Sequence, residues 1–339
     1  MKQGKIYRGG LGSLGRELGR GAYSDARFFI LLDENTFNHC LPQLVSSVGA
    51  LQEAEFIEVP AGEECKSLEV AAQVWQTLLE SGADRNAILV NLGGGSVCDL
   101  GGFVAAGYKR GIRHLNVPTT LLAMVDAAIG GKTAIDFGGV KNSIGHFYPP
   151  VLTAIEPAFL STLPQQELLC GLMEMVKTAA VADGTLYNHL VSHPDLDTAL
   201  ITSVAGIKAA VVRTDPFDCG VRRILNFGHT FGHAVEMHSG LPHGISVGVG
   251  MLAEMYLSVR KTGLGIEVYS AYSKWLRSCV DIPHYTLADA EHMLSIIHND
   301  KKNARASTLC VLLRALGEAV IDVEISDNEV RDALLRLGR

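Results

Sequence analysis

Apolar residues follow two different spacings in the first part of the chain. Four short, strongly apolar runs predict buried strands: 27–32, 55–59, 87–92 and 114–117. Residues 66–81 instead place apolar side chains at helical intervals and stop before Gly82. Strands that alternate with helices predict a parallel sheet covered by helices on both faces.

After about residue 150, helical spacing dominates. Apolar positions predict helices at 165–181, 199–213, 229–238, 245–261 and 288–298. One late run, from Thr308 to Leu313, is compatible with a strand. We therefore place a domain boundary near Pro149 and Pro150. We expect an α/β domain over residues 1–150 and a mostly α-helical domain over residues 151–339.

The composition is that of a folded protein without a general basic face. Hydrophobic residues make up 47% of the 339 residues and charged residues 19%, which excludes wholesale disorder. A formal net charge of −7 argues against a general nucleic-acid binder, but it leaves room for a local basic pocket. The seven cysteines are scattered and form no Cys-x-x-Cys pair, so we expect a reducing, cytoplasmic compartment. We expect neither a signal peptide nor a membrane span.

A glycine-rich turn follows the third predicted strand. Gly93, Gly94 and Gly95 lead through Ser96 into a predicted helix. In such a turn the backbone can approach a phosphate, and the helix N-terminus offers unpaired amides. The dinucleotide fingerprint G-x-G-x-x-G is not met, because its third position is Cys98. A tight strand-to-helix turn without a ligand is the alternative.

Three charged positions each admit two interpretations on local grounds. Asp33 ends the first strong strand, where a carboxylate can bind ribose hydroxyls, but a helix cap explains it equally well. Glu174 and Lys177 lie one turn apart in an apolar helical stretch. They either form a local ion pair on a solvent-exposed face of the helix, or both face a polar cavity.

The segment NFGHTFGHAVEMHSGLPHG is the strongest candidate for a metal site. His229 and His233 are four residues apart and share one face of a helix, and His243 follows after a Gly-Leu-Pro break. Imidazoles with a carboxylate suit zinc. From spacing alone, His229 and His233 are thus the first candidate metal ligands, and Glu236 or His243 would complete the site. Histidines bonded to backbone groups are the structural alternative.

Two motifs place lysines among small residues. VDAAIGGKTAI contains Lys132, and GGVKNSIG contains Lys141. Flexible ammonium groups in such segments suit phosphate oxygens. The alternative is that each lysine is simply solvated.

Taken together, these motifs resemble those of the 3-dehydroquinate synthase family of sugar-phosphate cyclases. The matching segments are PAGEECKS, GGGSVCDLGGFVAAGYKRG, VPTTLLAMVDAAIGGKTAIDFGGVKNSIGHFYPP, GLMEMVKTA, and RRILNFGHTFGHAVE with PHG. They run in this order from about residue 28 to residue 303. The resemblance implies a Rossmann-like, NAD-binding α/β domain and a mostly helical second domain, with the active site in the cleft between them. It also implies a cytoplasmic homodimer.

The activity implied by the resemblance is conversion of 3-deoxy-D-arabino-heptulosonate 7-phosphate into 3-dehydroquinate and phosphate, in the shikimate pathway. NAD and a divalent metal, zinc or cobalt, serve this reaction. NAD takes a hydride from a secondary alcohol, phosphate leaves by elimination, the hydride returns, and the ring recloses by an internal aldol step. Arg110 and the lysines would bind the departing phosphate, while Lys208 and Arg222 would hold the substrate carboxylate.

Site residues carry over by position. The implied metal ligands are Glu174, His229 and His243, which places His233 toward the substrate instead. The implied cofactor contacts are Asp33, Asn35, Glu63, Lys66, Gly94, Gly95, Ser96, Val97, Asp99, Thr119, Thr120, Lys141, Thr162 and Glu167. The implied catalytic and substrate contacts are Arg110, Asp126, Lys132, Asn142, Lys177, Lys208, Arg222, Asn226, His233 and one of Lys301 and Lys302.

Three rival functions stay open at this point. A metal-dependent alcohol or glycerol dehydrogenase shares the glycine turn and paired histidines, but it has no use for these lysines and typically takes an aspartate ligand. A sister cyclase, such as an aminodehydroquinate synthase, is compatible with the carboxylate-binding residues. A non-catalytic ligand-binding protein is disfavoured by the intact metal set. Four positions depart from the common family pattern and affect only the surroundings of the site: Ala127, Ala128, Asp218 and Ile245.

Overall fold

The computed structural model describes residues 4–7, 9–23, 25–192, 196–300 and 308–338. The chain forms two compact units. The first unit comprises Met1–Leu168 and Asp197–Phe217, and the second comprises Leu169–Leu196 and Asp218–Arg339. This grouping follows packing rather than function, so the functional boundary near residue 150 stays a prediction.

The first unit is built on a six-stranded parallel sheet with the order β1-β8-β5-β4-β2-β3. Its strands are β1 (Lys5–Tyr7), β2 (Phe28–Asp33), β3 (Glu55–Val59), β4 (Ile88–Gly93), β5 (Arg113–Pro118) and β8 (Leu152–Ala154). Every residue of β2 and β4 is buried, as expected of strands covered on both faces. The four predicted strands correspond to β2, β3, β4 and β5, so the predicted parallel sheet is confirmed.

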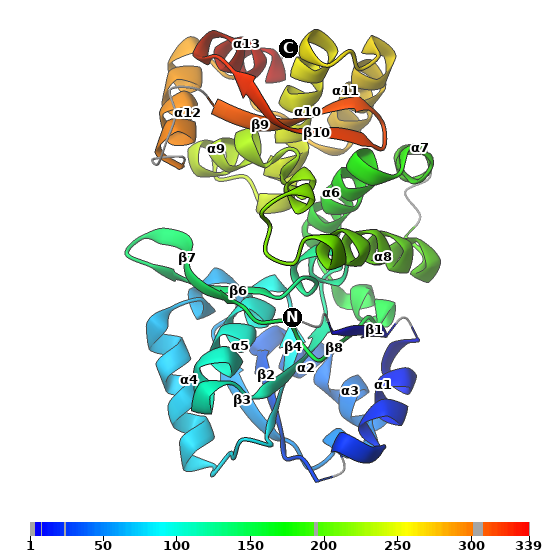
Figure 1. The fold of residues 1–339 in the computed structure, drawn as a ribbon, viewed down its shortest axis with the longest axis vertical. Helices are drawn as coiled ribbons and strands as arrows, with labels where there is room; N and C mark the ends of the chain where they lie inside the picture. Colours follow the sequence, from blue (N-terminus) through cyan, green and yellow to red (C-terminus); the bar gives the residue numbers. More distant parts are fainter. Residues whose placement is uncertain (1–3, 8, 24, 193–195, 301–307, 339) are drawn as a thin grey trace. The chain divides into compact units, whose positions relative to one another are not determined.

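Helices cover both faces of this sheet. In Figure 1, α4 and α5 lie on one side of the strands, and α1 and α3 lie on the other. The helices of the unit are α1 (Gly10–Leu18), α2 (Glu34–His39), α3 (Leu41–Ser47), α4 (Leu68–Glu80), α5 (Gly95–Gly107) and α8 (Thr198–Thr214), with short helical turns at Gly21–Tyr23, Gly49–Leu51, Gly62–Cys65, Tyr108–Arg110, Ala123–Ala127 and Pro157–Thr162. Phe29 and Leu89 of the sheet pack with Val74 of α4 and Leu100 of α5 in one core.

An antiparallel hairpin, β6 (Lys132–Phe137) and β7 (Val140–Phe147), projects from the first unit. Gly138 and Gly139, both with positive φ, form its turn. The sequence analysis predicts neither strand. Every residue of β7 is exposed, so no alternation of buried and exposed positions marks that strand. The hairpin carries three of the residues implied by the resemblance, Lys132, Lys141 and Asn142.

The second unit is mostly helical, as predicted. Its elements are α6 (Gln165–Ala182, which starts just before the division), α7 (Gly184–Ser192), a turn at Val221–Asn226, α9 (His229–Ser239), α10 (His243–Lys261), α11 (Ile266–Cys279), α12 (Leu287–Asp300), β9 (Thr308–Ala315), β10 (Glu318–Ile325) and α13 (Asp327–Leu337). The run that starts at Thr308 is confirmed as a strand, β9, which pairs with β10 in an antiparallel hairpin. Across the described residues, no helix is both long and apolar enough to cross a bilayer.

Candidate functional site

Three helices of the second unit bring together a carboxylate and two imidazoles. Glu174 lies in the middle of α6, His229 is the first residue of α9, and His243 is the first residue of α10. One ligand atom from each of the three lies within 4.8 Å of the others. The set implied by the resemblance therefore converges, although 55 residues or more separate Glu174 from either histidine in the sequence.

The distances between these atoms suit one small cation. Oε1 of Glu174 lies 3.6 Å from Nε2 of His243 and 3.9 Å from Nε2 of His229. Ligand atoms of a tetrahedral zinc ion are roughly 3.4 Å apart. Glu174 is fully buried, and its Oε1 accepts no hydrogen bond within the described part of the chain. A buried carboxylate oxygen that faces two imidazole nitrogens is a chemically suitable site for zinc or cobalt.

Neighbouring groups orient all three side chains. Nζ of Lys177 lies 2.5 Å from the other carboxylate oxygen of Glu174, in a buried ion pair. Nδ1 of His229 lies 3.3 Å from the carbonyl oxygen of Phe227, and Nδ1 of His243 lies 2.8 Å from Oε2 of Glu236. Burial alone lowers the pKa of His243, but the hydrogen bond with Glu236 and the charges of Glu174 and Glu236 outweigh it and raise that pKa.

His233, the first candidate from spacing alone, is not part of this set. Its ring lies edge-on to the ring of His229, with 5.3 Å between the ring centroids. It does share a helix face with His229, as the four-residue spacing predicts. Glu174, from a separate helix, joins His229 and His243 in the candidate set instead, as the resemblance implies, and the residues that bind a metal stay a prediction.

Glycines let the three helices come close enough to share a cation. A Cβ on Gly244 of α10 would lie 2.3 Å from the carbonyl oxygen of Cys170 in α6. A Cβ on Gly250 would lie 2.0 Å from the carbonyl oxygen of Gly228, the residue that precedes α9. Gly228 also has a φ of +82°, a conformation that side chains rarely allow. Larger residues at these positions would push apart the helices that carry the ligands.

Glu254, a buried residue of α10, supports the candidate metal site, and the sequence analysis does not identify it. Its Oε2 accepts a hydrogen bond of 2.6 Å from the backbone amide of Gly228, directly before His229. The side chain is fully buried. Glu254 thus fixes the backbone that presents His229. Its only signal in the sequence is a carboxylate inside an otherwise apolar helix.

The implied cofactor residues gather at one edge of the sheet in the first unit. Asp33 ends β2, the turn at Gly94 follows β4, and Thr119 follows β5, and these three strands are neighbours in the sheet. The chain switches direction across the sheet here, because β3 lies on one side of β2 and β4 on the other. Nucleotides bind open α/β sheets at such switch points, beyond the carboxyl ends of the strands.

The glycine turn has the features of a phosphate site. Gly94 is the N-cap of α5 and has no side chain to bond the first amides of the helix. These amides and the helix dipole favour a bound anion. Asp33 also caps α2, since its Oδ1 accepts a hydrogen bond of 2.9 Å from the amide of Thr36. The cap interpretation of Asp33 is therefore confirmed, and its contact with a ribose stays a prediction.

A buried lysine links the glycine turn to the hairpin. Nζ of Lys66 donates to Asp99 at 3.0 Å and to Oδ1 of Asn142 at 2.5 Å. Burial raises the pKa of Asp99 to about 6, against the opposing charge of Lys66. Ser96 donates a hydrogen bond to Glu63 beside this pair. Asn142 therefore lies with the implied cofactor contacts Lys66 and Asp99.

A second charged pair joins two implied substrate contacts in the first unit. Nζ of Lys208, on α8, lies 2.5 Å from Oδ1 of Asp126 and 2.8 Å from its carbonyl oxygen. Asp126 lies in a single wide helical turn, Ala123–Ala127, of a kind that is frequent at functional sites. Lys208 is 6% exposed, so its ammonium is held in place rather than solvated.

The other implied contacts are distributed over both units. Arg110 follows the last turn of α5, at the end opposite the glycine turn, and Lys132 begins β6. Arg222 is buried and Asn226 exposed in the turn that precedes α9. Thr162 and Glu167 are exposed near the start of α6. Lys301 and Lys302 lie outside the described residues.

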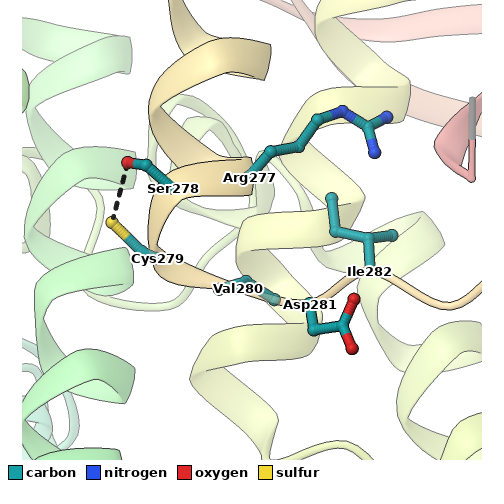
Figure 2. A pocket seen from close by; sticks show the side chains of 6 residues that line it. All are labelled: Arg277, Ser278, Cys279, Val280, Asp281 and Ile282. Carbon is teal, nitrogen blue, oxygen red and sulfur yellow. Dashed lines mark hydrogen bonds between the residues drawn. The ribbon is translucent and has the colours of Figure 1, made fainter.

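A hollow of about 350 Å³ lies at the end of α11 (Figure 2). It is lined by residues 277–282, and Oγ of Ser278 lies 3.7 Å from Sγ of Cys279. None of the implied site residues lines it. The hollow therefore takes no part in the candidate site.

Two family models match the chain consecutively. The model described as 3-dehydroquinate synthase N-terminal matches residues 56–170, and the one described as 3-dehydroquinate synthase C-terminal matches residues 171–303. A 3-dehydroquinate synthase of Parabacteroides distasonis is 37% identical over 320 residues, covering 91% of this chain and 90% of the relative.

Solved structures of related enzymes share the fold. A 2-epi-5-epi-valiolone synthase from Streptomyces hygroscopicus, solved with NAD⁺ and Zn²⁺ bound, is 27% identical with a TM-score of 0.85, over 99% of this chain and 97% of that one. A 2-deoxy-scyllo-inosose synthase complexed with carbaglucose-6-phosphate, NAD⁺ and Co²⁺ is 22% identical with a TM-score of 0.85, over 98% of this chain and 95% of that one. The dehydroquinate synthase-like fold expected from the sequence is confirmed.

Proposed function

The chain belongs to the 3-dehydroquinate synthase family, and we propose that it converts 3-deoxy-D-arabino-heptulosonate 7-phosphate into 3-dehydroquinate and phosphate. The single observation that carries this proposal is the convergence of Glu174, His229 and His243 in a chain that matches both family models. The glycine turn at the switch point of the sheet supports NAD as the second group. When bound, NAD accepts and returns a hydride, and the metal ion polarises the substrate oxygens that it contacts.

The chain's own residues position the substrate and balance its charge. Glu174, His229 and His243 would hold the cation and leave coordination positions for substrate oxygens. Lys66 and Asp99 fix the start of α5, where a nucleotide phosphate would bind. We propose that Lys132 and Arg110 bind the substrate phosphate, because both are exposed cations of the first unit.

Two buried cations suit a substrate carboxylate. Lys208 is held by Asp126, and Arg222 is buried in the turn before α9. Neither cation is free to be solvated, so each can meet an anion with little reorganisation. We propose that both contact the carboxylate and that Asn226 and His233 contact the substrate hydroxyls. This set favours a carboxylate-bearing substrate over a neutral polyol.

The assay that tests this function follows phosphate and NADH together. Purified protein is supplied with NAD, Zn²⁺ and the heptulosonate phosphate. We expect phosphate release at a rate that far exceeds NADH accumulation, because the hydride returns to the substrate in each turnover. Chelator should abolish the release, and added Zn²⁺ should restore it.

Two outcomes would contradict the proposal. Stoichiometric NADH accumulation on glycerol or another polyol would favour a dehydrogenase. Faster turnover of the amino analogue of the heptulosonate would favour a sister cyclase that makes aminodehydroquinate. Both substrates are therefore run beside the heptulosonate phosphate at equal concentration.

We propose further that the protein is a cytoplasmic homodimer. All seven cysteines are free thiols, which suits a reducing compartment. The hairpin exposes Phe137, Val140, Ile144 and Phe147, and such apolar groups mark surfaces that another protein covers. A second copy of the chain would cover them in the assembled enzyme.

Light scattering on a sizing column tests the dimer. We expect a mass of twice the 36.3 kDa of one chain. Phe137→Lys should shift the protein toward monomer, because a charge would be buried in the contact. Phe56→Lys, on an exposed residue of β3, is the matched control and should leave the mass unchanged. A monomeric wild type, or a Phe137→Lys dimer of equal stability, would contradict this surface.

A further inference from the structure

The outer ring nitrogen of His243, a candidate metal ligand, meets a carboxylate. Nδ1 of His243 lies 2.8 Å from Oε2 of Glu236, whereas Nδ1 of His229 lies 3.3 Å from the carbonyl oxygen of Phe227. The other nitrogen of His243, Nε2, points at Glu174 with 3.6 Å to Oε1. The two carboxylates therefore flank the same imidazole from opposite sides.

Local backbone structure fixes Glu236 beside His243. Glu236 lies in the last turn of α9, and its carbonyl oxygen accepts a hydrogen bond of 2.9 Å from Gly240, which caps the helix with a φ of +67°. Three residues then connect α9 to α10, which begins at His243. Oγ of Ser246 donates to the carbonyl oxygen of Leu241 and ties this connection to α10. The short, bonded connection brings Glu236 to His243.

We propose that Glu236 is a positioning residue for the metal centre, which accepts a hydrogen bond from Nδ1–H of His243 and thereby directs the lone pair of Nε2 at the cation. The inference rests on the proposed function, since it assumes that the Glu174–His229–His243 set binds a metal ion. An imidazole carries its one ring proton on either nitrogen, and only the tautomer with the proton on Nδ1 can bind through Nε2. Carboxylates that accept this proton fix both the tautomer and the ring orientation.

Glu236 is not itself a ligand in this arrangement. Its carboxylate meets the ring of His243 at Nδ1, while the candidate cation position lies beyond Nε2. The spacing of candidate ligands along the chain left two residues, Glu236 and His243, that could complete the metal site. The geometry divides these roles between them: His243 binds the ion, and Glu236 orients His243.

The experiment measures cobalt affinity of the apoprotein. Metal-free protein is titrated with Co²⁺ against a competing chelator, and the visible absorption of bound cobalt reports both affinity and coordination. Glu236→Ala should weaken Co²⁺ binding by about 10–100-fold, the usual effect of losing such a partner. Glu236→Gln keeps an acceptor oxygen at the same reach and should lose only about 5-fold.

Glu236→Asp separates position from charge. It keeps the negative charge but shortens the side chain by one methylene, so it should bind Co²⁺ more weakly than Glu236→Gln does. The cobalt bands at saturation should be the same in all variants, because the ligand set is unchanged. Met237→Ala, at a strongly exposed neighbour on α9, is the matched control and should bind Co²⁺ like the wild type.

Three results would overturn the assignment. One is a Glu236→Ala variant that binds Co²⁺ as tightly as the wild type. Another is a Glu236→Asp variant that binds better than Glu236→Gln, which would indicate a role for charge alone. The third is a shift of the cobalt bands, which would make Glu236 a ligand. The titration needs no substrate, so it stands apart from the phosphate-release assay that tests the proposed function.

Discussion

Glu174→Gln is expected to lower phosphate release by about 10³-fold, because it removes the anionic member of the candidate ligand set. A metal ion lowers the activation barrier of a reaction of this kind by several kcal/mol. A change of about 4 kcal/mol in the barrier corresponds to about 10³-fold in rate. Bound zinc, measured by elemental analysis of the folded protein, should fall in parallel. The variant also removes the charge that Lys177 faces at 2.5 Å, so the thermal midpoint should drop.

Glu53→Gln provides the matched control for this experiment. Glu53 is exposed in the first unit, so the same change of charge should leave zinc content, stability and phosphate release unaltered. Full zinc occupancy in Glu174→Gln would show that the cation is held elsewhere. A loss of rate at full occupancy would equally contradict the role of Glu174 as a ligand.

Gly250→Ala is expected to destabilise the protein by about 3 kcal/mol, near the upper end of the usual cost of forcing extra atoms into a packed core. The added Cβ would lie 2.0 Å from the carbonyl oxygen of Gly228 and 2.5 Å from the amide nitrogen of Gly232, and both are backbone atoms. Because α9 must move to relieve this contact, His229 moves with it. Zinc affinity should therefore fall together with the midpoint of urea unfolding.

Gly49→Ala tests whether any glycine replacement has this effect. A Cβ on Gly49 meets nothing within 4 Å, so this variant should unfold at the wild-type urea concentration or slightly above it. If Gly250→Ala also unfolds at the wild-type urea concentration, the close packing of α9 against α10 does not hold the candidate ligands in place.

The apolar pattern was sufficient to predict four of the six strands in the sheet of the first unit, for a simple physical reason. β2 and β4 are covered on both faces, so their residues are apolar or glycine except Asp33 and Asn91, and the apolar signal is nearly continuous. The hairpin at Lys132–Phe137 and Val140–Phe147 left no such signal. Its second strand is exposed throughout, so no buried face marks it in the sequence.

The metal set shows where local spacing stops being informative. The spacing of His229 and His233 correctly predicts a shared helix face, but coordination requires nitrogen and oxygen atoms a few ångströms apart. Only packing decides that, and here it depends on backbone contacts such as Gly244 against Cys170. The resemblance to a known family named Glu174, whereas no local feature distinguishes it from an ordinary buried ion pair with Lys177.

The three candidate ligands come from three different helices, so the binding site does not exist before those helices have docked. An ion that binds only the folded chain adds its binding free energy to the stability of the fold, by an amount that grows with the logarithm of free metal concentration. Zinc supply in the cell would then govern how long each molecule survives, as well as how fast it works. A cell short of zinc would lose this enzyme to proteolysis in addition to losing its turnover.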